Sequence, residues 1–82
     1  MAEVITVDGN RSTLKDTKLA TLQGAVGGYI EIVSIGNNKI MVLDEEGKLK
    51  NKPINRIATE LYGNPNDVVV GDVVVCDDNE ID

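Results

Sequence analysis

The apolar positions of the chain follow two patterns, one typical of strands and one typical of helices. Four segments are rich in β-branched residues, and in the segment 29–35 the alternation separates two faces. Asp8-Gly9-Asn10 and Gly36-Asn37-Asn38 are turn signals between such segments. The pattern predicts strands over residues 3–7, 29–35, 39–43 and 72–76, and the middle two form a hairpin.

Two further segments repeat apolar residues at helical spacing. The first stripe consists of Leu19, Leu22 and Val26, and the second of Ile54, Ile57, Ala58, Leu61 and Tyr62. The first predicts a helix over residues 14–25, with Ser12 or Thr13 as the N-cap and Gly27-Gly28 after its end. The second predicts a helix that follows Pro53, with Tyr62 as a core residue.

The order of these elements, β-α-β-β-α-β, predicts a single small α+β domain over residues 1–82. We expect one mainly antiparallel sheet with two helices packed on a face. Residues 77–82 are acidic and are expected to fray. Because the chain has no Trp and no Phe, its core must come from Val, Ile and Leu. A core this thin in a domain this short favours a homo-oligomer.

Charge and cysteine content narrow the classes of partner. The net charge of −6 repels phosphates and argues against sequence-independent nucleic-acid binding. The acidity fits a soluble surface, and an acidic inhibitor that imitates DNA is the alternative. The single cysteine, Cys76, fits the reducing cytoplasm. The sequence shows neither a signal-peptide pattern nor an apolar run long enough to span a bilayer, so no membrane partner is expected.

The residue types that most enzymes need are scarce. Without histidine and with one cysteine, the chain cannot make a Cys/His zinc site or a Ser-His pair. Gly24-x-x-Gly27-Gly28 matches neither phosphate-binding glycine pattern. We therefore expect no catalytic residues, no metal and no cofactor. A metal-dependent phosphodiesterase that uses Glu31 is the weakest hypothesis.

Candidate binding residues cluster at two junctions between elements. Around the glycine pair stand Gln23, Gly27, Gly28, Tyr29 and Glu31, and at the start of the second helix stand Asn55, Arg56 and Thr59. Exposed N–H groups at a helix start, together with an arginine, can hold an anion.

Structural alternatives remain for each of these residues. The glycine pair can be a plain helix-to-strand connection, and Glu31 can be a solvent-facing carboxylate on an edge strand. Arg56 can pair with Glu60. The acids at 44–46 are interpreted as a solvated turn, and Lys48, Lys50 and Lys52 as solvated lysines on one side of the chain.

Four short motifs carry a family resemblance. They are Leu22-Gln23-x-x-Val26-Gly27-Gly28-Tyr29-Ile30-Glu31, Asp44-Glu45-x-Gly47-Lys48-Leu49, Asn55-Arg56-x-Ala58-Thr59 and Val70-Gly71-Asp72-Val73. Together they resemble a family of small proteins of unknown function encoded by bacteriophages and other mobile elements. Lys52 departs from that family's usual apolar residue before the proline. The resemblance implies a cytoplasmic location in an infected bacterial host.

By analogy with other small phage proteins, the hypothesis is a non-enzymatic protein that sequesters a nucleotide-derived immune signal. Such signals include cyclic ADP-ribose types and cyclic dinucleotides. Tyr29 would stack on a base, Arg56 would hold phosphate, and Gln23, Glu31, Asn55 and Thr59 would bind ribose. The alternatives are an acidic inhibitor of a host defence or restriction protein and a phage accessory protein without a small ligand.

Overall fold

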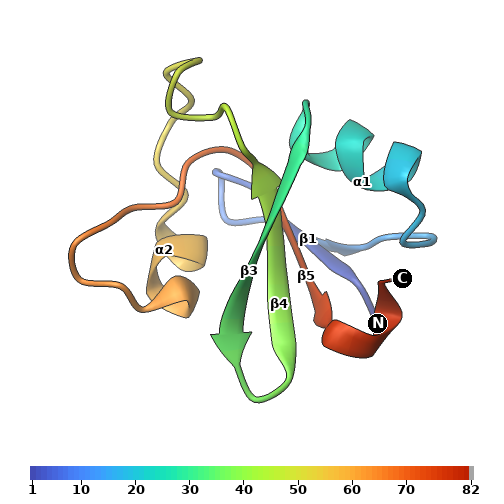
Figure 1. The fold of residues 1–82 in the computed structure, drawn as a ribbon. Coiled ribbons are helices and arrows are strands. Elements are labelled where there is room, and N and C mark those ends of the chain that lie inside the picture. Colours follow the sequence, from blue (N-terminus) through green and yellow to red (C-terminus); the bar gives the residue numbers. More distant parts are fainter. Residues whose placement is uncertain (82) are drawn as a thin grey trace.

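The computed structural model describes residues 1–81, which form one five-stranded antiparallel sheet with a helix on each side (Figure 1). The strands are β1 (Glu3–Ile5), β2 (Arg11–Thr13), β3 (Ile30–Gly36), β4 (Lys39–Asp44) and β5 (Val73–Asp77). They lie in the order β2-β1-β5-β4-β3. The helices are α1 (Leu19–Val26), α2 (Arg56–Tyr62) and the 3-10 helix η1 (Asp78–Glu80). The predicted α+β class is confirmed, as are the β3–β4 hairpin and the strand β5. No helix in this range is long and apolar enough to cross a membrane.

The first predicted helix begins later than its sequence suggested. Residues 11–13, expected to cap and start that helix, instead form β2, which pairs with β1. The turn at Gly9 returns the chain at once, so the Leu14 N–H donates to the Ala2 carbonyl over 2.9 Å. The capping prediction for Ser12 and Thr13 is therefore wrong, because pairing with a strand ten residues away outweighs local capping. The helix itself begins at Leu19, after Lys18.

The second helix also begins later than predicted, at Arg56 instead of directly after Pro53. The Pro53 carbonyl accepts from the Gly71 N–H over 2.9 Å, and Ile54 forms a β-bridge with Val70. These contacts hold the chain extended, so the helix starts only after its N-cap, Asn55.

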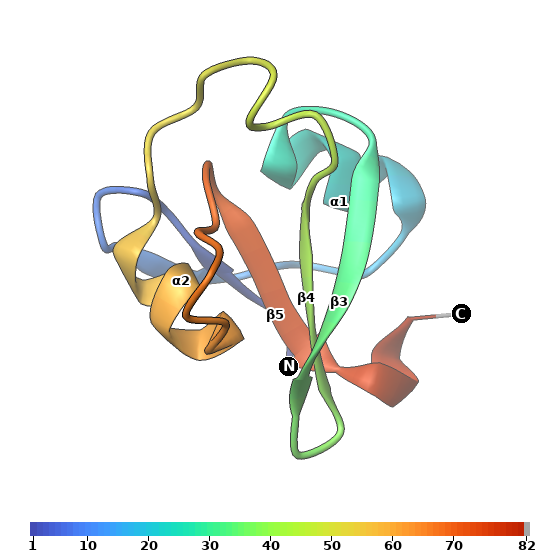
Figure 2. The same ribbon diagram turned by 60° about the vertical axis from the view of Figure 1, so that its left-hand side comes forward.

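The two helices cover opposite faces of the sheet, not one face as expected. Leu22 and Val26 of α1 pack on one side with Val42 and Val74. Ala58 of α2 packs on the other side, where the core contains Ile5, Met41 and Val73. Neighbouring strand residues point to opposite faces, so the apolar pairs Met41-Val42 and Val73-Val74 leave both faces in need of cover. Figure 2 shows the sheet between the two helices.

The acidic C-terminal segment that was expected to fray contains η1. Its Asp77 and Glu80 form a reciprocal capping box. The Glu80 carboxylate also lies 3.3 Å from the N-terminal ammonium group, and its backbone carbonyl accepts from Thr17 Oγ1 over 2.6 Å. These contacts connect the C-terminal segment to the start of the chain and to the approach to α1. Asp82 lies outside the described residues.

Candidate functional site

The Gly27-Gly28 pair ends α1 beside two lysines from a distant loop. Gly27 adopts a left-handed conformation, with φ 83°, and its N–H donates to the Gln23 carbonyl. Lys52 Nζ donates to the Val26 carbonyl over 2.6 Å, and Lys50 Nζ to the Gly27 carbonyl over 3.2 Å. Lysines near the last carbonyls of a helix also favour its dipole. The hydrogen bonds of these two lysines therefore connect the loop of residues 45–52 to the end of α1.

Both lysines also bind Asp44, which is buried at the end of β4. Its Oδ2 lies 2.9 Å from Lys50 Nζ and 2.8 Å from Lys52 Nζ, and its Oδ1 accepts from the Glu46 N–H. Burial alone would raise the pKa of the Asp44 carboxyl, but the hydrogen bonds from Lys52 and Lys50 outweigh it and lower the pKa to about 2. We call Asp44, Lys50 and Lys52 the aspartate–lysine node. The interpretation of Asp44 as part of a solvated turn, and of these two lysines as merely solvated, is wrong.

The node also explains why glycine stands at position 28. A Cβ atom there would lie 2.6 Å from Lys50 Nζ and 2.9 Å from Asp44 Oδ1. A Cβ on Gly71 would lie 2.8 Å from Lys52 Cδ. Side chains at these two positions would displace the lysines. The glycines therefore allow the close approach of the lysines to the end of α1.

The residues predicted to form a binding site lie in separate places. Gln23, Gly28 and Tyr29 surround a shallow hollow with Glu46 and Lys50. Glu31 instead lines a separate cleft, to which Gln23, Gly28 and Tyr29 do not contribute. Within the chain the structure therefore does not bring Tyr29 and Glu31 to the same cavity.

Asn55 and Thr59 use their polar atoms inside the fold. Asn55 is 1% exposed; its Oδ1 accepts from the Ala58 N–H, and its Nδ2 donates to the carbonyls of Ile5 and Gly71 over 3.0 Å each. Thr59 Oγ1 donates to the Asn55 carbonyl and accepts from the Val69 N–H. Arg56 is exposed beside them and is not a lining residue of the Glu31 cleft. Among residues 1–81 no ion pair joins Arg56 to Glu60.

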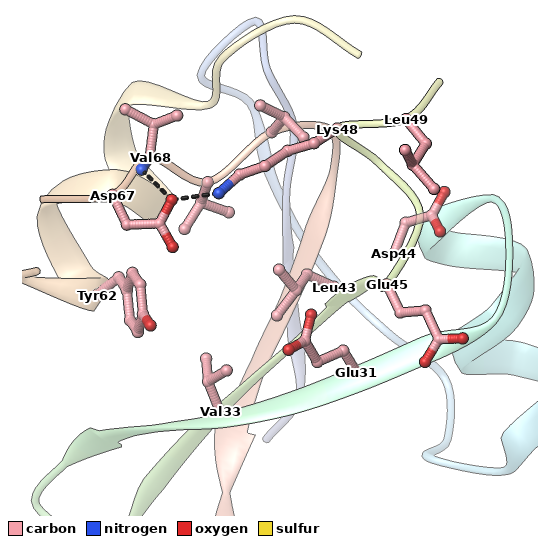
Figure 3. Close-up of a pocket in the computed structure, with 12 residues that line it drawn as sticks. Glu31, Val33, Leu43, Asp44, Glu45, Lys48, Leu49, Tyr62, Asp67 and Val68 are labelled. Atoms are coloured by element: carbon pink, nitrogen blue, oxygen red, sulfur yellow. Dashed lines mark hydrogen bonds and ion pairs between the residues drawn. The ribbon is translucent and has the colours of Figure 1, made fainter. Parts of the chain in front are cut away.

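The cleft is formed by β3, β4, the loop 45–52 and the chain that follows α2, and has a volume of about 200 Å³. Figure 3 shows Tyr62, at the end of α2, and Glu31, on β3, on opposite sides of the cleft, with Val33 between them and Leu43 beside Glu31. The rest of the lining comes from Asp44, Glu45, Lys48, Leu49 and the segment 67–70. Sequence analysis missed Tyr62 as a lining residue because its place on the apolar stripe of α2 indicated only a core position.

Some of the charged side chains around the cleft form ion pairs, and others do not. Lys48 and Asp67 form an ion pair at one end, and the hydrogen bond from Lys48 lowers the pKa of the Asp67 carboxyl. Lys48 is exposed, as expected, and its ion pair with Asp67 is an addition to that expectation. Glu31 has no hydrogen-bond or ion-pair partner among residues 1–81, and the carboxylate of Glu45 is turned away from the centre (Figure 3). Glu31 is thus the carboxylate available to a molecule in the cleft.

Within residues 1–81 no group of three or more His, Cys, Asp or Glu side chains is placed to hold a metal ion. The cleft instead combines an aromatic ring, aliphatic walls and a few polar groups, the composition of a small-molecule site.

A family model described as a domain of unknown function, DUF3846, matches residues 1–82. The comparisons with curated proteins and with solved structures gave no match.

Proposed function

The chain belongs to the DUF3846 family, whose description names no activity, and from that premise we propose a non-enzymatic binding protein. It holds one ring of a nucleotide-derived small molecule in the cleft between Tyr62 and Glu31. The observation that carries the proposal is this cleft, in which an unpaired carboxylate faces an aromatic side chain across an apolar floor.

The volume of the cleft limits what it accepts. Sites for drug-sized ligands usually measure roughly 300–1,000 Å³, whereas a cavity of about 150 Å³ accepts a benzene ring. At about 200 Å³ this cleft fits a single ring. A nucleotide would therefore enter with its base or its ribose, and the rest of the molecule would stay outside.

The polar groups favour the nucleoside part over the phosphates. Glu31 can accept hydrogen bonds from ribose hydroxyls, and the ring of Tyr62 offers a surface for stacking. Glu31 and Asp67 would repel a phosphate inside the cleft, and Lys48 is already paired with Asp67. This assignment moves the predicted stacking residue from Tyr29 to Tyr62 and leaves Arg56 outside.

A more specific part of the proposal concerns the organism in which the protein acts and its role there. The resemblance in the four sequence motifs supports an origin in bacteriophages or other mobile elements, with the protein acting in the cytoplasm of the host. A small binding protein there would act by sequestering a nucleotide-derived immune signal. The second hypothesis, an acidic DNA mimic, requires dense free carboxylates on one face. Five carboxylates are already paired with a cation of this chain and are not free for that purpose: Glu3, Asp44, Asp67, Asp77 and Glu80.

Titration calorimetry with adenosine, AMP, cyclic ADP-ribose and a cyclic dinucleotide tests the proposal. At least one of these ligands should bind, and Glu31→Gln should weaken that binding about tenfold, equivalent to about 1.4 kcal/mol. Tyr62→Leu should weaken it further through the loss of stacking.

Glu60→Gln is the matched control, because it removes a carboxylate from the exposed surface of α2, away from the cleft lining. Arg56→Ala is the second control, and both should bind as the parent protein does. No heat of binding at millimolar ligand, or an equal loss in Arg56→Ala and Glu31→Gln, would refute the cleft as the site.

A further inference from the structure

The two edges of the sheet differ in length and chemistry. One edge is β2, which has three residues and carries Arg11. The other is β3, which has seven residues, Ile30–Gly36, and only one charged side chain, Glu31. Charges and short strands protect an edge against pairing with another chain, and β3 has little of this protection. We propose that two copies of this chain pair antiparallel through β3, around a twofold axis at Ile32.

The register of the β3–β4 hairpin shows which backbone groups of β3 are free. The Glu45 N–H donates to the Tyr29 carbonyl over 3.0 Å, and Ile30 is opposite Asp44. Hydrogen-bonded and non-hydrogen-bonded pairs alternate along an antiparallel ladder. Tyr29, Glu31 and Val33 therefore direct their N–H and C=O groups to β4. Ile30, Ile32 and Ser34 direct theirs to the open edge.

The side chains of those three edge-directed residues are uncharged, although the chain as a whole has a net charge of −6. Ile32 is 46% exposed and Leu19 of α1 is 58% exposed. Both line a groove along this edge. Its apolar part also includes Leu22, Ile30 and Ile81, and its polar end consists of residues 16–18. Pairing at the edge would bring the Ile32 side chains of the two copies together on this face.

The position of the twofold axis decides which residues of the two β3 strands lie opposite each other, and this comparison selects the register. An axis at Ile32 pairs Ile32 with itself and Ile30 with Ser34, so all three edge-directed residues exchange both of their backbone hydrogen bonds. An axis at Glu31 would place the two Glu31 carboxylates opposite each other, which destabilises a strand pair. An axis at Val33 would place Ile30 opposite Gly36, where the irregularity between Ser34 and Gly36 interrupts the strand register. The Ile32 register is therefore favoured.

A second copy suits this edge because the same uncharged strip serves both partners of a twofold pair. A standard interface covers about 800 Å² on each partner, about one-sixth of the 5111 Å² surface of this chain. We expect the pairing of one seven-residue strand, supplemented by the Leu19 groove, to cover less than that. We therefore expect a dimer that dissociates at micromolar concentration and is strengthened by salt, which screens the two negative chains.

Disulfide trapping tests the register. In a hydrogen-bonded pair the two Cα atoms lie about 5.5 Å apart, within the range that a disulfide spans. Under mild oxidation Ile32→Cys should give a covalent dimer. Ser34→Cys is the matched control, because it lies on the same face and edge but is opposite Ile30, and it should stay monomeric on a denaturing gel. The native Cys76 is buried and does not compete.

Sedimentation velocity tests the dimer without cross-linking. The parent chain should shift from monomer to dimer as its concentration rises through the micromolar range. Ile32→Lys should remain monomeric, whereas Thr13→Lys, the same change on the β2 edge, should dimerise normally. A parent chain that is monomeric at about 1 mM, a dimer that persists in Ile32→Lys, or cross-linking in Ser34→Cys alone would overturn the proposal.

Discussion

Replacing Asp44 with asparagine removes the charge that Lys50 and Lys52 share at the end of α1. In the folded chain the Asp44 carboxyl has a pKa of about 2, below its ordinary value of 3.8. A depressed carboxyl pKa contributes stability that is fully present well above the ordinary value. That contribution is lost as the pH falls from about 5 towards the folded-state pKa.

The shift sets the size of the effect. Each unit of pKa difference corresponds to 1.36 kcal/mol, so a fall from 3.8 to about 2 is worth about 2 kcal/mol at neutral pH. Lys50 and Lys52 remain 41% and 22% exposed, and solvent screens their charges. We therefore expect Asp44→Asn to lower the free energy of unfolding by about 1–2 kcal/mol at pH 7.

Urea unfolding followed by circular dichroism, repeated between about pH 7 and pH 2, measures this contribution. The parent chain should lose about 1–2 kcal/mol more than Asp44→Asn across that range, so the two stabilities converge in acid. Asp67→Asn removes an ion pair on a partly exposed carboxylate and should cost less than about 1 kcal/mol at pH 7. Parallel pH profiles for the parent and Asp44→Asn would refute the reasoning.

Three further predictions concern other parts of the fold. Gly28→Ala should destabilise the chain by about 1 kcal/mol through displacement of Lys50, whereas Gly24→Ala, where a Cβ meets nothing within 4 Å, should stabilise α1 by about 0.5–1 kcal/mol; urea unfolding distinguishes the signs. Asn55→Ala should cost about 2–4 kcal/mol in the same assay, because it removes the N-cap of α2 and leaves the Ile5 and Gly71 carbonyls without their donor. Burial raises the pKa of the Cys76 thiol, so a thiol reagent should modify it at least about 100-fold more slowly in the folded chain than in urea, and equal rates would contradict its burial.

The elements that the sequence predicted well depend on short-range signals. The β3–β4 hairpin follows from alternating strands around Gly36-Asn37-Asn38. Asn37 and Asn38 both have positive φ, as the two central residues of a tight hairpin turn often do, and Gly36 also has positive φ at the irregular end of β3. The strand β5 follows from a continuous apolar run. Long-range contacts were not predictable in this way. The polar β2 exists because it pairs with β1, and the opposite placement of the two helices depends on which face each loop reaches.

In the candidate site, too, short-range features were predictable from the sequence and long-range contacts were not. Glu31 was predicted correctly to lie on the face that also carries Val33, because strand alternation fixes that choice. Its position across a cleft from Tyr62 depends on how α2 packs over the sheet, and no local pattern records that packing. The pairing of Asp44 with Lys50 and Lys52 was hidden for a related reason, since the signal of a polar turn is the same whether its charges meet water or each other.

The glycine pair and the cleft are connected through the loop 45–52. Asp44, directly before that loop, and Lys52, at its end, both belong to the aspartate–lysine node, and within the loop the Lys50 N–H donates to the Glu46 carbonyl over 3.0 Å. The same loop carries Lys48 and Leu49 into the lining of the cleft. Gly28 leaves room for the lysines, the lysines hold the loop against α1, and the loop sets one wall of the cleft. In the function that we propose, the glycine pair would act through the position of this wall and would not itself contact the ligand.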